Sequence, residues 1–307
     1  MLPPPGGHDK MRPSTQPQGF VIPISGFTIV RNGVKLGFPV VESIRSLLPV
    51  CEEVIVNIGK SDDETLDLVK SIDDPRIRIL ETEWDFSDRN YVFGRETLRA
   101  MRECRHPWGI YIQADEVLHE NGAHELQRVI QEVDGDPNVE ALLCRYLHFY
   151  GDTFTLATHR RWYRREIRTV RLDPALDIRP YQGAQGFRVG PDHRKIRARL
   201  TNAEMFHYGW ARPPEYIQKK REFTRDLFPG KEKEQLPLLP WEPLIKPFTG
   251  RHPAVATAWA EQRRAPAGER RVDDPKYSWD AFRFYLSDVI ERVTGERVFE
   301  FRNYTLV

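Results

Sequence analysis

The sequence of 307 residues lacks the features that mark several classes of protein. Its three cysteines, Cys51, Cys104 and Cys144, are scattered and form no C-x-x-C pair, so neither a zinc ribbon nor a disulfide-rich secreted scaffold is indicated. No apolar run approaches the roughly 20 residues that span a bilayer, and the N-terminus lacks the pattern of a signal peptide. We therefore expect a cytoplasmic protein without a transmembrane segment.

The chain also lacks a large net charge of either sign, and it lacks the common nucleotide-binding motifs. Its 46 basic and 45 acidic side chains give a formal net charge of +1, which offers no overall attraction for nucleic acid. No G-x-x-x-x-G-K-[ST] loop, G-x-G-x-x-G fingerprint or G-x-S-x-G elbow occurs. These absences argue against P-loop NTPases, nicotinamide dehydrogenases and α/β-hydrolases.

What is present is an alternation of short apolar runs with amphipathic segments, which begins near residue 20. Residues 1–18, rich in proline, glycine and polar side chains, are expected to be disordered. The alternation that follows is typical of βαβ units and a mostly parallel sheet. Strands are expected at 26–30, 54–58, 76–80, 108–113 and 140–150, and helices at 39–48, 61–72, 90–104, 121–133, 215–227 and 278–293.

Two carboxylates, Asp115 and Glu116, directly follow the strand expected at 108–113. Ligands of open parallel sheets bind outside the carboxyl ends of the strands, and oxygen ligands of this kind suit Mg²⁺ or Mn²⁺. An acidic pair in this place can equally do no more than cap the helix that follows. The spacing alone leaves the two interpretations open.

His207 and an arginine-rich stretch at 159–199 are further candidates for function. His207 lies among aromatic residues, where a lone histidine is more often a hydrogen-bonded core residue than a metal ligand. The arginines can bind phosphate through bidentate contacts, or nucleic acid together with neighbouring aromatic rings. The plain alternative is that they form the solvated faces of strands.

Taken in order, residues 19–212 resemble family 2 glycosyltransferases of the GT-A fold. The segment 53–65 (EVIVNIGKSDDET) is similar to a strand and aspartate-rich loop of that family, matched at Asp63 and Thr65. The segment 112–116 (IQADE) is similar to the family's acidic element, with Asp115 at the position that implies a metal contact. A subset of the family looks closest, on residues 113–120, 184–188 and 207–214.

The resemblance implies an α/β fold with a Rossmann-like, mostly parallel central sheet flanked by helices, and a helical C-terminal extension over 213–307. It implies that Asp115 and His207 hold Mn²⁺ or Mg²⁺, and that Asp173 or Asp177 lies in the stretch that provides the catalytic base. The residues implied to bind the sugar nucleotide are Thr28, Val30, Arg31, Asn57, Asp63, Arg95, Gln113 and Ala114, and those implied to contact substrate are Glu116, Gln185, Gly186 and Arg188.

The implied function is metal-dependent transfer of a sugar from a nucleoside diphosphate to an acceptor hydroxyl, with inversion. The acceptor is expected to be a saccharide or a lipid-linked molecule, with peripheral membrane contact allowed and no nucleic acid involved. Two alternatives stay open: a nucleic-acid or polyanion binding module that uses residues 159–199, and a catalytically impaired protein that binds sugar nucleotides. Nucleotidyl transfer is disfavoured, because Arg31-Asn32-Gly33 is the whole of the loop after the first strand.

Overall fold

The computed structural model of the chain describes residues 21–88, 90–181, 183–227, 243–265, 279–295, 297 and 300–307. The segment predicted to be disordered, residues 1–18, lies outside them. No helix among the described residues is both long enough and apolar enough to cross a membrane.

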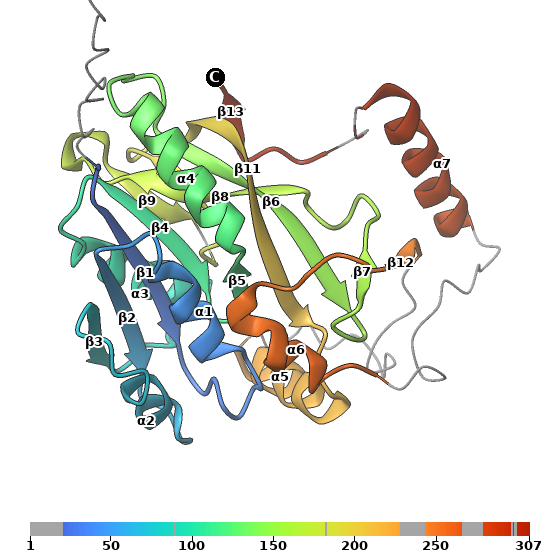
Figure 1. Ribbon diagram of the computed structural model, residues 1–307, viewed down its shortest axis with the longest axis horizontal. Coiled ribbons are helices and arrows are strands. Elements are labelled where there is room, and N and C mark those ends of the chain that lie inside the picture. The colour runs from blue at the N-terminus through green and yellow to red at the C-terminus, as the bar shows by residue number, and fades with distance from the viewer. Residues whose placement is uncertain are drawn as a thin grey trace, which may run out of the picture.

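Helices and strands alternate through the first half of the chain, and strands dominate the second half (Figure 1). The strands are β1 (Ile24–Val30), β2 (Glu53–Gly59), β3 (Ile77–Thr82), β4 (Trp108–Gln113), β5 (Glu116–Leu118), β6 (Ala141–Tyr150), β7 (Thr155–Ala157), β8 (Arg165–Arg171), β9 (Ile178–Tyr181), β10 (Gly186–Val189), β11 (Arg194–Trp210), β12 (Ile245–Pro247) and β13 (Tyr304–Leu306). The helices are α1 (Val40–Leu47), α2 (Thr65–Lys70), α3 (Val92–Arg102), α4 (Glu120–Val133), α5 (Pro214–Leu227), α6 (Thr257–Glu261) and α7 (Trp279–Thr294), with 3₁₀ turns η1 (Pro174–Leu176) and η2 (Ala254–Ala256).

One sheet organises the molecule, with its main strands in the order β3-β2-β1-β4-β8-β6-β11-β10-β9. The pairs β1–β2, β2–β3 and β1–β4 are parallel, and so is β6–β11. The predicted α/β class with a mostly parallel central sheet flanked by helices is therefore confirmed. An antiparallel strand, β8, joins the β1–β4 half to β6. Strands β1 and β2 are buried along their whole length, as expected when both faces of a sheet are covered.

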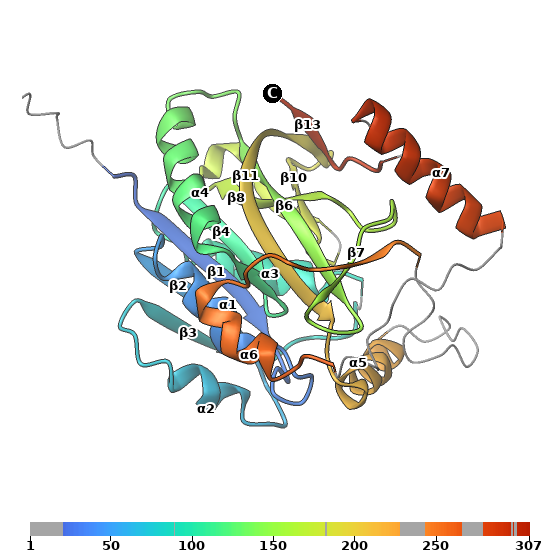
Figure 2. The same cartoon turned by 45° about the vertical axis from the view of Figure 1, so that its right-hand side comes forward.

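Helices cover both faces of this sheet (Figure 2). On one face Ile44 of α1, Val69 of α2 and Leu126 of α4 belong to one apolar cluster with residues of β1, β2 and β4. On the other face Ala100 of α3 packs in a second cluster with Phe187 of β10. The chain thus has a core on each side of the sheet, and the carboxyl ends of the strands are left to form a site.

The strand order reverses at β1. The chain runs from β1 outward to β2 and β3, and then crosses back through α3 to β4 on the other side of β1. Because the two crossover directions diverge between β1 and β4, a crevice opens at their carboxyl ends. This is where the sequence places Arg31 and Asp115.

Residues beyond 212, predicted as a helical extension, contain helices α5, α6 and α7 and also complete the sheet. Strand β13 pairs with β11, and β12 pairs with β7. Helix α7 packs on the same chain: the Phe284 ring lies 4.7 Å from that of His159, and Glu291 Oε1 accepts a hydrogen bond from Arg164 at 3.0 Å. The C-terminal part is therefore joined to the rest of the chain by backbone and side-chain contacts.

An aromatic cluster that packs against helix α6 contains a buried histidine. His252 lies against the rings of Phe149 and Phe154, and its Nδ1 is 2.7 Å from the hydroxyl of Tyr208. Burial lowers the pKa of His252 to about 4. The neutral imidazole is therefore the form that the folded state favours.

This histidine predicts a pH dependence of stability. Because the folded pKa lies below the unfolded value near 6.5, the unfolded chain binds the proton first, and stability is lost as the pH falls from 6.5 toward 4. Allowing for partial solvent contact, we expect wild type to lose about 1–2 kcal/mol more than His252→Gln between pH 7 and pH 5. Urea unfolding at the two pH values measures this difference. Equal losses in the two proteins would show that His252 does not titrate with unfolding.

Candidate active site

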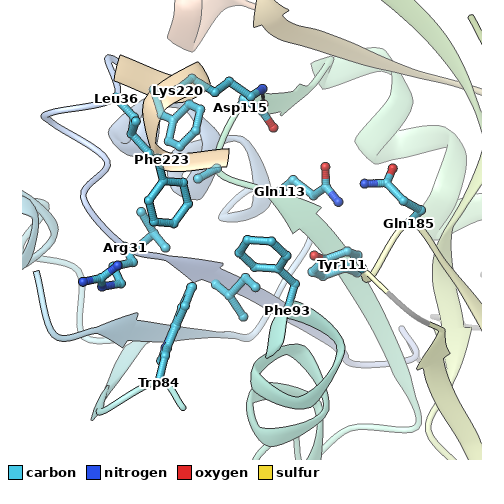
Figure 3. A pocket seen from close by; sticks show the side chains of 15 residues that line it. Arg31, Leu36, Trp84, Phe93, Tyr111, Gln113, Asp115, Gln185, Lys220 and Phe223 are labelled. Carbon is cyan, nitrogen blue, oxygen red and sulfur yellow. Dashed lines mark hydrogen bonds and ion pairs between the residues drawn. The ribbon is translucent and has the colours of Figure 1, made fainter. Parts of the chain in front are cut away.

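A pocket with a volume of about 200 Å³ lies at the carboxyl ends of β1 and β4 (Figure 3). Strand β1 and its loop, strand β4, helix α3 and helix α5 all contribute side chains. The lining residues are Ile29, Val30, Arg31, Leu36, Phe38, Trp84, Phe93, Tyr111, Gln113, Ala114, Asp115, Gly183, Gln185, Lys220 and Phe223. Its position is the crevice expected from the strand order.

One part of the pocket is charged. Asp115 comes two residues after the end of β4, and its Oδ2 lies 3.3 Å from Nζ of Lys220, which reaches in from α5 (Figure 3). The same ammonium donates to the carbonyl oxygen of Gly209 at 3.3 Å. A Cβ atom at Gly209 would stand 2.6 Å from His207 Nε2 and 2.8 Å from Asp115 Oδ2. Only glycine allows β11 to pass this close to the carboxylate.

Two histidines behind Asp115 form a hydrogen-bonded chain that defines their tautomers. His148 Nε2 lies 2.7 Å from the carbonyl oxygen of Tyr163, which only accepts, so Nε2 carries a proton. The Nδ1 of neutral His148 then accepts from Nδ1 of His207 at 3.0 Å. In neutral His207 the remaining Nε2 is therefore unprotonated, and it lies 3.8 Å from Asp115 Oδ2.

The charges around Asp115 set its protonation state. Burial raises the pKa of Asp115, but the charge of Lys220, that of His207 in its protonated form and that of Arg212 outweigh burial and hold this pKa well below its usual range. Burial also lowers the pKa of His207, and the Asp115 charge opposes that change. The site therefore presents a carboxylate beside an ammonium, with a histidine that burial favours as neutral.

The donor atoms near Asp115 do not fit a divalent cation. Nucleotide-bound Mg²⁺ is held by one or two carboxylates together with phosphates and waters, whereas Asp115, the one carboxylate among the described residues that line this pocket, is already paired with Lys220. The Lys220 ammonium already stands beside the carboxylate oxygen and would repel a dication. Within the described parts of the chain, no group of three His, Cys, Asp or Glu side chains is placed to hold a metal ion. The Mn²⁺ or Mg²⁺ expected from the sequence stays a prediction.

A buried ion pair supports the polar wall of the pocket. The guanidinium of Arg168 binds both carboxylate oxygens of Glu116, at 2.9 and 2.8 Å, and both side chains are 0 % exposed. Glu116 also accepts from the hydroxyl of Tyr146 at 2.8 Å and from the backbone of Gln113 at 3.0 Å. Arg168 donates to the carbonyl oxygen of Gln185 at 3.1 Å. The pair thereby ties two lining residues, Gln113 and Gln185, to the core.

The far part of the pocket is aromatic and apolar. Trp84 and Phe93 stand edge to face with ring centroids 6.1 Å apart, and Tyr111 lies beside them (Figure 3). Arg31 closes this side, with its guanidinium carbon 4.9 Å from the Phe86 ring centre and its Nε donating to the Lys60 carbonyl at 2.8 Å. The pocket thus joins an aromatic wall to a charged part that contains Asp115 and Lys220.

The structure brings six of the predicted site residues together in this pocket. Val30 and Arg31 lie at the carboxyl end of β1, and Gln113, Ala114 and Asp115 lie at the carboxyl end of β4. Gln185 faces them from the loop before β10, and the side chains of Gln113 and Gln185 point toward one another in Figure 3. His207 lies immediately behind Asp115.

The other predicted residues do not line the pocket. Asn57 has its amide bound to Glu96 and Thr82, so both polar groups of this side chain are engaged within the protein. Both oxygens of Glu116 are bound by Arg168, which gives this residue a structural role. Asp63 accepts hydrogen bonds in the loop before α2, and Arg95 binds Asp85. Thr28 is buried in β1. Gly186 packs on Asn303, and Arg188 binds the backbone of the same residue.

The expected catalytic carboxylates lie at a different depression. Asp173 caps η1 through the backbone N–H of Ala175, and Asp177 accepts from Arg179 Nε at 2.7 Å. Both aspartates line a separate hollow between α3 and the start of β9. Among the described residues that line the main pocket, Asp115 is the one carboxylate.

Many arginines of the stretch 159–199 bind other groups of the folded chain. Arg171 stacks on Trp108 at 4.4 Å and donates to the carbonyl of Asp134, while Arg194 and Arg197 both bind Glu140. Carboxylates and backbone carbonyls therefore bind each of these three guanidinium groups. The contacts weaken the interpretation of this stretch as a surface for nucleic acid.

Sequence reasoning missed Lys220, Phe223, Trp84, Phe93 and Tyr111. Helix α5 was predicted at 215–227, but nothing in its amphipathic pattern tells which strand ends it faces. The available signal is charge: a lysine on a helix that begins a few residues after the predicted site residue His207 can return to that site. Trp84 lies in an aromatic segment, WDF, just beyond β3.

Comparisons with known proteins add little beyond this geometry. No family model and no curated protein matches the chain. Among solved structures, residues 1–349 of S. aureus TarS give a TM-score of 0.41 at 14 % identity, over 69 % of this chain and 67 % of that one. The same TarS fragment in complex with UDP gives 0.42 at 14 % identity, over 69 % and 68 %. Mannosyl-3-phosphoglycerate synthase from Rubrobacter xylanophilus gives 0.30 at 18 % identity, over 41 % of each chain.

Proposed function

We propose that this chain transfers a sugar from a nucleoside diphosphate sugar to an acceptor hydroxyl. The observation that carries the proposal is the pocket at the β1–β4 switch point, where the aromatic wall adjoins the charged part. Trp84, Phe93 and Tyr111 suit the flat faces of a nucleobase, and Arg31 and Lys220 suit a diphosphate. The sequence resemblance to family 2 glycosyltransferases points to the same chemistry.

In this reaction an acceptor oxygen forms a bond to the anomeric carbon while the bond from that carbon to the β-phosphate oxygen breaks. The nucleoside diphosphate leaves with the electron pair, and the acceptor proton passes to water or to a base. Charge develops on the leaving diphosphate, so cationic groups fixed beside it lower the barrier. Lys220 and Arg31 are the cations that line the pocket. Inversion, a saccharide or lipid-linked acceptor and membership of family 2 belong to the proposal.

A second candidate function is binding of a sugar nucleotide with little or no turnover. The observation in its favour is that Asp115, already paired with Lys220, is the one carboxylate among the described lining residues. An acceptor hydroxyl would then lack a base close to the reacting carbon.

One experiment separates the two functions. The chain is incubated with UDP-, GDP- and ADP-sugars, and release of the nucleoside diphosphate is followed with and without a mixture of saccharide acceptors. Transfer predicts release that increases with acceptor and disappears in Trp84→Ala, because the aromatic wall that holds the base is lost. Binding without turnover predicts saturable binding and no release. If the chain binds none of these donors and releases no nucleoside diphosphate from them, both functions are excluded.

A further inference from the structure

Lys220 enters the pocket from a helix that lies outside the βαβ half of the fold. Its Nζ is 3.3 Å from Asp115 Oδ2 and 3.3 Å from the carbonyl oxygen of Gly209, and 26 % of the side chain is exposed. The ammonium also lies 5.4 Å from the centre of the Trp210 ring. A lysine held by a carboxylate, a carbonyl and an aromatic ring keeps one position, which is what a binding group requires.

Helix α5 is anchored so that Lys220 returns to the strand ends. Arg212, just before the helix, donates to the carbonyl oxygens of Gly209 and Leu36, and its guanidinium carbon lies 4.6 Å from the centre of the Phe38 ring. Ile217 on the inner face of α5 is buried. These contacts join α5 to β11 and to the loop after β1. The position of the helix therefore places Lys220 beside Asp115.

The local charges favour an anion in front of Lys220. Asp115 faces two cations, Lys220 and Arg212, so this cluster carries one net positive charge. Arg31 adds another positive charge on the aromatic side of the pocket. A diphosphate between Lys220 and Arg31 would meet positive charge from two directions, without any ion that the protein must first recruit.

Resting on the proposed function, we propose that the Lys220 ammonium, positioned by Asp115, is the cation that binds the donor diphosphate. It takes the place of the divalent ion that the sequence resemblance implies, and the chain binds its donor without metal. Asp115 is then a positioning residue, and its carboxylate serves the lysine. His207, hydrogen-bonded through His148 to the Tyr163 carbonyl, packs behind Asp115, with its Nε2 3.8 Å from Asp115 Oδ2.

The test is titration calorimetry with UDP, GDP and ADP and with their nucleosides, in EDTA and in Mn²⁺. Wild type is expected to bind its preferred diphosphate equally well in both buffers. Lys220→Met is expected to lower the affinity for the diphosphate by about ten- to a hundredfold and to leave the affinity for the nucleoside unchanged. A merely structural role would weaken both ligands alike. Lys219→Met is the matched control, since the neighbouring Lys219 is exposed on the same helix and does not line the pocket.

Two outcomes would overturn the proposal and leave the proposed function standing: loss of diphosphate binding in EDTA with recovery in Mn²⁺, or unchanged binding by Lys220→Met. The EDTA comparison uses wild type and is independent of how the variant folds. If no diphosphate binds in either buffer, the proposed function fails, and the role of Lys220 fails with it.

Discussion

Replacing Glu116 with leucine is expected to lower the free energy of unfolding by about 3–5 kcal/mol. The change leaves the guanidinium of Arg168 without its counter-charge in a place where neither side chain is exposed at all. It also leaves the Tyr146 hydroxyl and the Gln113 backbone N–H without their acceptor. Breaking one partner of a buried pair costs far more than the pair itself contributes, because the remaining charge cannot be solvated.

Denaturant unfolding measures this loss, and a double variant tests whether the unpaired charge of Arg168 is its cause. Glu116→Leu with Arg168→Leu removes both charges and is expected to recover a large part of the stability. The exposed pair Lys35–Asp62 has a comparable separation of 2.7 Å but side chains 46 % and 60 % exposed, so Asp62→Asn should cost less than about 1 kcal/mol. A loss of similar size in Asp62→Asn, or no recovery in the double variant, would contradict the account.

Asp115→Asn is expected to lower kcat/KM for the donor by about 10²–10³-fold. The amide is nearly isosteric, but it removes the charge that holds Lys220 at 3.3 Å and leaves Lys220 and Arg212 to repel one another. Steady-state release of the nucleoside diphosphate measures the effect. The diphosphate should also bind more weakly, because its ammonium partner is no longer positioned.

The same assay decides whether the aspartates implied by the family resemblance take part. Asp177 is bound to Arg179 at a hollow separate from the pocket. Asp177→Asn should therefore leave kcat/KM within about twofold of wild type. A large loss in Asp177→Asn together with a small one in Asp115→Asn would move the reaction away from the β1–β4 crevice.

Local pattern was sufficient for the first half of the fold. Strand β4 has the predicted bounds, Trp108–Gln113, and β1, β2 and α3 differ from prediction by a few residues at their ends. These elements are buried on one or both faces, so their hydrophobic period is strong. Asp115 could be predicted for the same reason: it follows the end of a strand that the sequence marks clearly.

In the second half, local pattern predicted α5 and α7 to within one residue at each end, but it could not predict the contacts of this half, because they are long-range. Arg168 looks like one member of a solvated arginine run, and only Glu116, 52 residues earlier in the chain, makes it a core residue. Lys220 meets Asp115 across 105 residues. The last strand, β13, pairs with β11 although its residues show no extended alternation. Period and composition carry no information about which partner a charged side chain meets in the folded chain.

The central claim, that the β1–β4 pocket binds a nucleoside diphosphate, can be tested by filling that pocket. Gly183 lines it, and a Cβ atom placed there meets nothing within 4 Å, so Gly183→Phe can add bulk without disturbing the core. Gly135, equally open but away from the pocket, provides the control Gly135→Phe.

Equilibrium binding of UDP, GDP and ADP to the three proteins is the measurement. The account predicts that wild type and Gly135→Phe bind at least one of these diphosphates with equal affinity, and that Gly183→Phe binds it more than about tenfold more weakly. Equal binding by all three proteins, or binding by none, would contradict it.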